Sequence, residues 1–211
     1  MEFLPLFPLN LVVFPGEKLR LYIFEPRYRQ LVNECIEEKK TFGIPPVIDQ
    51  KLGTIATEME VISVDKKFEG GEMNVTTRGL RRARIDHYYH ESPGKMYPGG
   101  EISWLPQEEE AAPPALQAEI FELVIKLHDA LGITNKKMDS VEDVHAYALA
   151  HDLGLNLSQE FKLLSLDNEL SRLSFIKSHL EKVIPVVNET ERLKARAKLN
   201  GHYKQLLPPD F

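Results

Sequence analysis

Residues 3–28 read FLPLFPLNLVVFPGEKLRLYIFEPRY, and this stretch decides how the first part of the chain folds. Short runs of leucine, valine and aromatic residues are broken by proline and glycine, which is typical of β-strands joined by turns. Phe14-Pro15-Gly16-Glu17 predicts a type II turn, because proline presets φ at one central position and glycine accepts positive φ at the next. We interpret this turn as structural; a loop that shapes a binding groove is the alternative.

The strand-like pattern continues to residue 105. The expected strands span 4–14, 18–24, 42–47, 54–67, 72–78, 80–88 and 101–105. Glu69-Gly70-Gly71 predicts a hairpin turn, since glycine reaches positive φ at little cost. One amphipathic helix, from Pro26 to about Lys39, interrupts the strands. Its apolar side chains recur at helical spacing and are Tyr28, Leu31, Val32, Cys35 and Ile36.

Residues 106–114, PQEEEAAPP, predict a linker, because an acidic run with prolines resists both strand pairing and helix formation. Beyond it the apolar period changes to that of helices. We expect one helix to end at Gly132, a second to run from Ser140 to Gly154, a third to follow Ser158, and a last stripe to stop at Pro185. The predicted division is a strand-rich subdomain 1–105, the linker 106–114, a helical subdomain 115–187 and a charged tail 188–211. The fold class is therefore α+β.

Composition excludes several classes of protein. The chain has 211 residues, of which 43% are hydrophobic and 27% charged, as in ordinary globular proteins. Its single cysteine, Cys35, allows no intramolecular disulfide and no thiolate cluster for a metal, which favours a reducing, cytoplasmic setting. No apolar stretch is long enough to predict a membrane span. The net charge of −6 weakly opposes binding to nucleic acid or anionic lipid.

Motifs that carry chemistry are missing from the sequence. It has no GxxxxGK[ST], no GxGxxG and no GxSxG pattern. His87 and His90 would point to opposite faces of a strand, and His145 and His151 diverge on a helix, so we expect no metal site. Cys35 lies on the apolar stripe of its helix, which favours a buried thiol over a nucleophile. We therefore predict no cofactor, no catalytic residues and no enzymatic activity.

The densest basic feature is the group Arg78, Arg81, Arg82 and Arg84. Such a group could engage phosphates. In a strand, however, Arg82 and Arg84 share one face while Arg81 lies on the other, and no aromatic residues stand between them to stack on bases. We favour a solvated face with local Asp or Glu partners over a nucleic-acid surface.

The order of these features resembles the N-terminal substrate-binding domain of the ATP-dependent Lon protease, and more closely the stand-alone versions of that domain. The specific blocks are LPLFPL at 4–9, VVFPGE at 12–17, LYIFEPRY at 21–28 and FGI at 42–44. Residues 53–56 and the arginine-rich segment GLRRARI at 79–85 add to the resemblance. It covers residues 3 to about 184.

The resemblance implies a small PUA-like β-barrel with one helix, followed by a helical bundle. It also implies a noncatalytic module that recognises unfolded polypeptides or a protein partner, for example as an adaptor in protein quality control. The 211 residues contain neither an ATPase module nor a Ser–Lys proteolytic domain, so proteolysis and ATP use are not carried over. Oligomeric state is left open.

A barrel beside a bundle would leave a cleft for a ligand, and an exposed strand edge could pair with an extended peptide. Glu25 and Arg27 flank Pro26 at a strand-to-helix junction, where pinning that junction is the alternative role. The predicted ligand-binding residues are Phe14, Glu25, Arg27, Tyr28 and Trp104, with core packing as the alternative for the aromatic ones. An RNA-binding PUA-like protein is the alternative function, and it would use Arg78, Arg81, Arg82 and Arg84.

Overall fold

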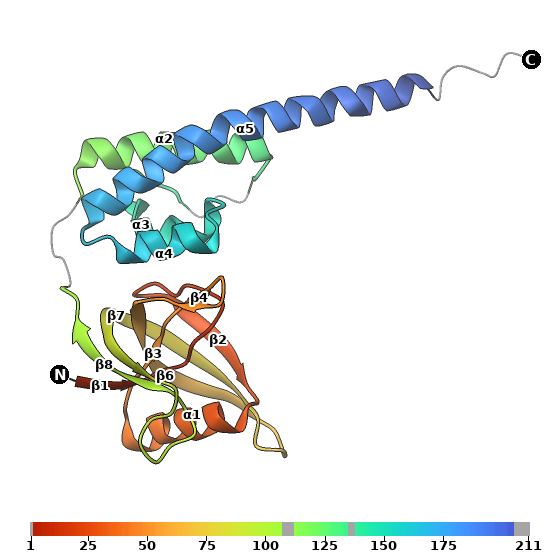
Figure 1. Cartoon of the computed structure of the whole chain (residues 1–211). Coiled ribbons are helices and arrows are strands. Elements are labelled where there is room, and N and C mark those ends of the chain that lie inside the picture. The colour runs from red at the N-terminus through yellow and green to blue at the C-terminus, as the bar shows by residue number, and fades with distance from the viewer. Residues whose placement is uncertain (1, 107–111, 135–137, 205–211) are drawn as a thin grey trace, which may run out of the picture. The chain divides into compact units, whose positions relative to one another are not determined.

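The structure is a computed structural model that describes residues 2–106, 112–134 and 138–204, with side chains to residue 197. The chain forms two compact units, Met1–Glu109 with Gly154–Asp167, and Glu110–Leu153 with Asn168–Phe211. Strands lie in the N-terminal part and most helices in the C-terminal part (Figure 1), which confirms the α+β class. The division at 106–114 stays a prediction, and 107–111 lie outside the described residues.

The first unit is built on an antiparallel sheet. Its strands follow the order β1-β8-β7-β6-β3, and β2 pairs with β7. Isolated parallel bridges, Leu6↔Gly43 and Leu9↔Pro46, join the chain after β1 to β3 and its continuation, so the two ends of the order meet as a small barrel requires. The strands are β1 Glu2–Pro5, β2 Lys18–Ile23, β3 Phe42–Ile44, β4 Val47–Ile48, β5 Lys51–Leu52, β6 Ile55–Lys67, β7 Met73–Tyr89 and β8 Gly99–Trp104.

The strand predictions differ from the structure at four places. The strand expected at 42–47 ends at Ile44, and Val47 begins β4. The strand expected at 4–14 ends at Pro5, because prolines lack the amide hydrogen that a ladder needs. The strands expected at 72–78 and 80–88 are one continuous strand, β7, which includes Gly79 and has a register shift beside it in its pairing with β6. The β4–β5 hairpin was not predicted; Asp49 and Gln50 turn it with φ of 48° and 63°. The hairpin at 69–71 is confirmed by the pairing of β6 with β7.

The Pro15-Gly16 turn docks on the middle of β7. Gly16 has φ +85°, and the Glu17 amide donates to the Phe14 carbonyl over 3.1 Å, as expected of a type II turn. The Gly16 amide donates to the Gly79 carbonyl over 2.9 Å, and the Gly79 amide donates to the Glu17 carbonyl over 2.8 Å. A Cβ at Gly79 would overlap the Phe14 carbonyl oxygen. Gly79 is therefore a site of close backbone approach rather than a strand end.

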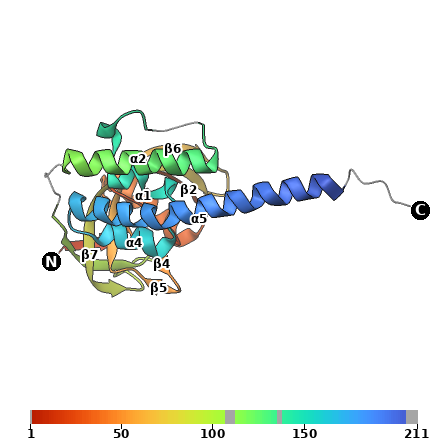
Figure 2. The ribbon, with the colours of Figure 1, turned by 90° about the horizontal axis from the view of Figure 1, so that it is seen from above.

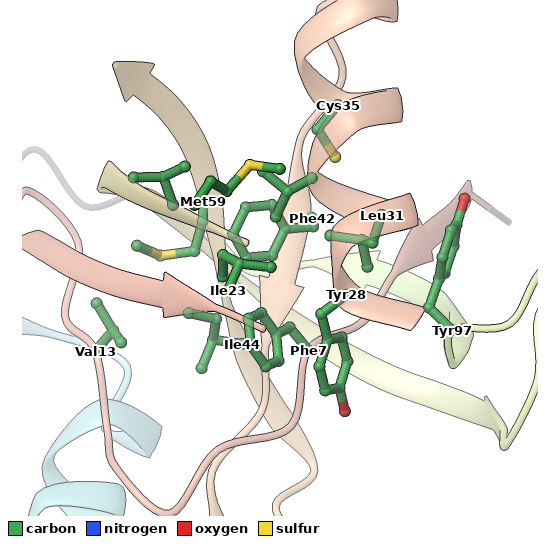
Figure 3. Close-up of a cluster of buried hydrophobic side chains, with 13 residues drawn as sticks. Phe7, Val13, Ile23, Tyr28, Leu31, Cys35, Phe42, Ile44, Met59 and Tyr97 are labelled. Carbon is green, nitrogen blue, oxygen red and sulfur yellow. The ribbon is translucent and has the colours of Figure 1, made fainter. Parts of the chain in front are cut away.

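The helix α1, Pro26–Glu38, covers the barrel core and confirms the predicted amphipathic helix. Tyr28, Leu31 and Cys35 point from it into the cluster drawn in Figure 3. The rings of Phe7 and Tyr28 stack with centroids 3.9 Å apart. Burial raises the pKa of the Cys35 thiol to about 12, so this thiol is protonated at neutral pH, as its position on the stripe predicts.

The helix α4, Leu157–Ser165, belongs to the first unit although its sequence lies beyond residue 114. Asn156, not Ser158, caps it, through a capping box with Gln159. The Arg82 guanidinium of β7 donates from Nη1 to the carbonyls of Leu164 and Leu166 over 2.8 and 2.7 Å. These bonds hold the carbonyl end of α4 to the sheet.

The second unit is helical, and its two long helices, α2 and α5, run side by side (Figure 2). Gly132 ends α2 with φ +67°, as predicted. The helix expected from Ser140 to Gly154 breaks into short turns, while Gly154 adopts φ +71° where it was expected to end. The helices are α2 Pro114–Leu131, α3 Ala146–Leu149 and α5 Glu169–Lys204, with 3₁₀ turns η1 Val141–Asp143 and η2 Ala150–Asp152.

The prediction that Pro185 stops the last helix was wrong, because α5 continues through it to Lys204. Proline removes one helical hydrogen bond, but residues 191–199, ERLKARAKL, are all strong helix formers. Glu189 pairs with Arg192 at 4.0 Å and Glu191 with Lys194 at 2.7 Å, both at i,i+3 spacing. The predicted charged tail is thus helical to Lys204, and 205–211 lie outside the described residues.

Candidate functional site

Three aromatic side chains meet on the outside of the first unit. Tyr22, Phe24 and Phe68 are 55%, 58% and 37% exposed. The Tyr22 ring stacks on Phe24 and meets Phe68 edge-on, each with centroids 5.8 Å apart. We call these three residues the aromatic cluster. Because these exposed rings are contiguous, the aromatic cluster is a candidate interaction site.

Strand alternation and register produce the aromatic cluster. Along β2, Leu19, Leu21 and Ile23 turn inward, so Tyr22 turns outward together with the exposed Lys18 and Arg20. Met73 of β7 lies between Ile23 of β2 and Lys67 of β6. The residues that follow, Phe24 and Phe68, therefore come to the same end of the sheet.

Charged residues also lie on the strands that carry the aromatic cluster. The Lys66 ammonium lies 4.6 Å from the centroid of the Phe68 ring, a cation–π contact. Asp65 accepts hydrogen bonds from the hydroxyls of Ser63 and Thr76, each 2.6 Å long. Those bonds, with a smaller contribution from Arg20, hold the pKa of Asp65 below its ordinary value. The surface is thus aromatic at one end of β2 and charged beside it.

Three of the predicted ligand-binding residues lie in contact: Arg27 pairs with Glu25, and its guanidinium lies 4.6 Å from the centroid of the Tyr28 ring. Phe14 is fully buried and Tyr28 is 5% exposed, so both are interior packing residues. Trp104 is half-buried beneath Arg81, whose guanidinium lies 3.5 Å from the centroid of the indole. Only Glu25 and Arg27 combine exposure with charge; they form a surface ion pair of 2.8 Å. The Glu25–Arg27 pair lies at the start of α1, directly after Phe24.

The arginine strand does not form one basic surface. Arg78 donates to Glu60 over 2.8 Å, Arg81 to Glu58 over 2.7 Å, and Arg84 to Asp86 over 3.2 Å. Local carboxylate partners were the favoured interpretation. The prediction that Arg82 shares a solvated face with Arg84 was wrong: Arg82 is 5% exposed, because α4 covers it. Its guanidinium cannot reach a nucleic acid without losing α4.

Sequence reasoning did not predict the aromatic cluster, because Tyr22, Phe24 and Phe68 are not among the predicted ligand-binding residues. The alternation in KLRLYIF at 18–24 was a usable signal, because it places Tyr22 opposite the inward leucines. Phe68 gave no comparable signal, since its position depends on how the hairpin β6–β7 pairs with β2.

A second polar feature ties α1 to the segment between β7 and β8. Glu34 accepts hydrogen bonds from the Tyr97 hydroxyl over 2.6 Å and from the Lys95 ammonium over 2.8 Å. Gln30 donates to Glu34 over 3.0 Å and accepts from the Met96 amide over 3.1 Å. Beside this network lies a pocket of about 470 Å³. It is lined by residues of β1, α1 and the β7–β8 segment, among them Phe3, Pro5, Glu38, Ser92 and Pro93.

The Glu34 network predicts a pH-dependent stability. Burial favours the neutral acid, but hydrogen bonds from Lys95, Tyr97 and Gln30 outweigh it and lower the pKa of Glu34 below its ordinary value of 4.5. A lowered folded-state pKa stabilises the fold above pH 4.5, and this contribution disappears as pH falls through the lowered value. We expect Glu34→Gln to be less stable than the wild type at pH 7, with the difference shrinking toward pH 3. Urea midpoints across this range measure it.

The control for this measurement is Glu37→Gln, because Glu37 lies exposed on the same helix. Its urea midpoint should differ little from that of the wild type at every pH. A Glu34→Gln variant whose deficit stays constant from pH 7 to 3 contradicts the assignment to the ionised carboxylate.

The described residues also bear on metal binding and on membrane spans. Across the described ranges, His, Cys, Asp and Glu side chains form no group of three or more that could hold a metal ion. In the same residues, no helix combines the length and the apolar character needed to cross a bilayer.

The chain is similar to known proteins both in sequence and in fold. A sequence model described as the ATP-dependent protease La (LON) substrate-binding domain matches residues 3–182. The crystal structure of a Lon N-terminal domain protein from Xanthomonas campestris is 27% identical, with a TM-score of 0.65, over 82% of this chain and 96% of that one. The N-terminal domain of the Mycobacterium avium complex Lon protease is similar in fold: it is 21% identical, with a TM-score of 0.64, over 85% of this chain and 98% of that one. No curated protein matches the chain.

Proposed function

The chain belongs to the ATP-dependent protease La (LON) substrate-binding domain family, and we propose on that premise that it binds non-native polypeptide through the aromatic cluster. The observation that carries this proposal is the exposure of Tyr22, Phe24 and Phe68 as one group of rings in mutual contact. Folded proteins bury most of their aromatic side chains. An exposed group of aromatic rings is therefore suited to contact a partner whose own apolar residues are exposed.

The chemistry of the aromatic cluster fits a broad range of polypeptides. Ring faces contact apolar side chains of many shapes, whereas a polar pocket would demand one arrangement of donors and acceptors. Unfolded or damaged chains expose such apolar side chains along their length, while folded proteins bury them in their cores. The proposed selectivity is therefore for the unfolded state rather than for one sequence.

The proposed role is binding without chemistry, as in an adaptor for protein quality control. The matched family model describes a substrate-binding module, which is noncatalytic in itself. In this proposal the partners are unfolded polypeptides or a protein that presents an exposed apolar segment. The single cysteine, buried and protonated, suits a cytoplasmic setting in which thiols stay reduced.

Substitutions in the aromatic cluster test this proposal. We expect Tyr22→Ser, Phe24→Ser and Phe68→Ser each to weaken binding of a labelled, permanently unfolded protein about 5- to 10-fold, because each removes about 1 kcal/mol of ring contact. Fluorescence anisotropy titrations measure the affinities, and circular dichroism checks that each variant is folded.

Met96→Ser is the matched control, since Met96 is an apolar residue of the same unit with 54% exposure. It should bind as the wild type does. If the variant lacking all three rings bound the unfolded protein with wild-type affinity, the aromatic cluster would not be the binding surface.

A further inference from the structure

The strand β2 has one paired edge and one open edge. In the described part of the chain, β2 pairs only with β7. Its outward residues Lys18, Arg20 and Tyr22 are all exposed. An open strand edge offers unpaired amides and carbonyls to another chain.

The hydrogen bond between Gly79 and Glu17 shows which backbone groups face that open edge. The Gly79 amide donates to the Glu17 carbonyl over 2.8 Å, so Glu17 is directed toward β7. Hydrogen-bonded and open positions alternate in an antiparallel pair, which directs the main chain of residues 19, 21 and 23 toward β7 as well. The amides and carbonyls of Lys18, Arg20 and Tyr22 therefore point to the open edge.

The side chains along this edge change character from one end to the other. Tyr22 and Phe24, at the carboxyl end of β2, belong to the aromatic cluster. Lys18 and Arg20, at the amino end, form no ion pair within 4.0 Å with any carboxylate that the structure describes. The edge thus presents a basic half and an aromatic half, and Asp65 lies near Arg20, since it accepts a hydrogen bond from Thr76, the residue opposite Arg20.

We propose that the open edge of β2 binds an extended polypeptide segment as an added antiparallel strand, with apolar residues in its N-terminal half and acidic residues in its C-terminal half. The inference rests on the proposed function and names the class of segment that this surface selects. Every strand pair of the main sheet is antiparallel, which favours the same direction for an added strand.

The antiparallel direction fixes the order of the segment. Its N-terminal half lies beside Tyr22 and Phe24, where aromatic and aliphatic side chains contact the rings. Its C-terminal half lies beside Lys18 and Arg20, where carboxylates complement the ammonium and the guanidinium. Residues directly opposite share one face, so only alternate residues of the segment determine selectivity.

The test uses a fluorescein-labelled eight-residue peptide and the full chain. Alternate positions carry two phenylalanines in the N-terminal half and two glutamates in the C-terminal half, with threonines between them. The backbone amides of the phenylalanines and glutamates would face β2. N-methylation of one phenylalanine and one glutamate should therefore weaken peptide binding about 10-fold or more. N-methylation of two threonines, which removes the same number of donors from the other edge of the peptide, should change the affinity less than about 3-fold.

A second set of affinity measurements tests the charges on β2 and the order of residues in the peptide. We expect the double variant Lys18→Glu with Arg20→Glu to bind the glutamate peptide about 10-fold more weakly. The same variant should bind a peptide with lysines in place of the glutamates more tightly. Lys51→Glu with Lys39→Glu, two exposed lysines elsewhere in the unit, should leave both affinities unchanged. A peptide of reversed order should bind more weakly than the original.

Each outcome decides for or against the inference. Equal binding of the two N-methylated peptides overturns strand addition, and tighter binding of the reversed peptide overturns the antiparallel direction and the assigned order. The aromatic-cluster variants could bind the unfolded protein more weakly while neither N-methylation nor charge reversal changes the affinity for the peptide. In that case the inference fails and the proposed function stands. If neither the peptide nor any unfolded protein binds, both fail.

Discussion

Arg82→Ala is expected to lower the free energy of unfolding of the first unit by about 3 kcal/mol, since hydrogen bonds to a charged donor contribute about 1.5–3 kcal/mol each and their loss leaves buried acceptors unpaired. Arg82 is 5% exposed, and its Nη1 bonds the carbonyls of Leu164 and Leu166. Those carbonyls end α4, where no further helical amide can reach them. Alanine supplies no donor, so α4 should detach from the sheet first.

Hydrogen exchange of the α4 amides measures this effect directly, and urea unfolding followed by circular dichroism gives its size. Arg84→Ala is the matched control, because Arg84 lies two positions along the same strand and is exposed with one carboxylate partner, Asp86. Its effect should stay within about 0.5 kcal/mol. Equal exchange rates in α4 of both variants would show that Arg82 does not hold this helix.

Gly79→Ala is expected to destabilise the first unit by about 3 kcal/mol or more, because overpacking against rigid backbone forces a shift of the chain. The new methyl group would overlap the Phe14 carbonyl oxygen and approach the Phe14 carbonyl carbon to 3.2 Å. Phe14 cannot withdraw easily, since it is fully buried and its turn is tied to Gly79 by two backbone hydrogen bonds.

Gly70→Ala is the comparison for this experiment. A Cβ at Gly70 would lie 2.5 Å from a carboxylate oxygen of Glu72, at the end of a flexible side chain that can rotate away. We expect a cost below about 1 kcal/mol there. Thermal unfolding of both variants separates a backbone clash from the general effect of adding a methyl group. A Gly79→Ala midpoint equal to that of Gly70→Ala would contradict the close approach.

Features that depend on neighbouring residues could be predicted from the sequence. The helix at 26–38, the hairpin at 69–71 and the helix end at Gly132 each follow from spacing or turn chemistry within a few residues. The family resemblance rested on the same local blocks, and the match over residues 3–182 confirms it. Residues that serve the fold, such as Phe14 and Gly79, thus carried much of the resemblance.

Features that depend on distant residues could not be predicted. The burial of Arg82 requires acceptors 82 and 84 positions later in the chain, so the strand pattern alone placed it on a solvated face. Phe14 was selected as a ligand contact because it borders a turn, but that turn docks on β7 and buries it. The aromatic cluster forms only when β2 and β6 both pair with β7.

The first unit is made of two separate stretches of sequence, so its parts are synthesised at different times. The sheet emerges early, but α4 follows only after residues 110–153 have been made. At about 5–20 residues per second, synthesis from 110 to 167 takes several seconds. During that interval α4 has not been made, and Arg82 lacks the carbonyls of Leu164 and Leu166 as acceptors. Maturation of the unit therefore waits for translation to pass residue 167.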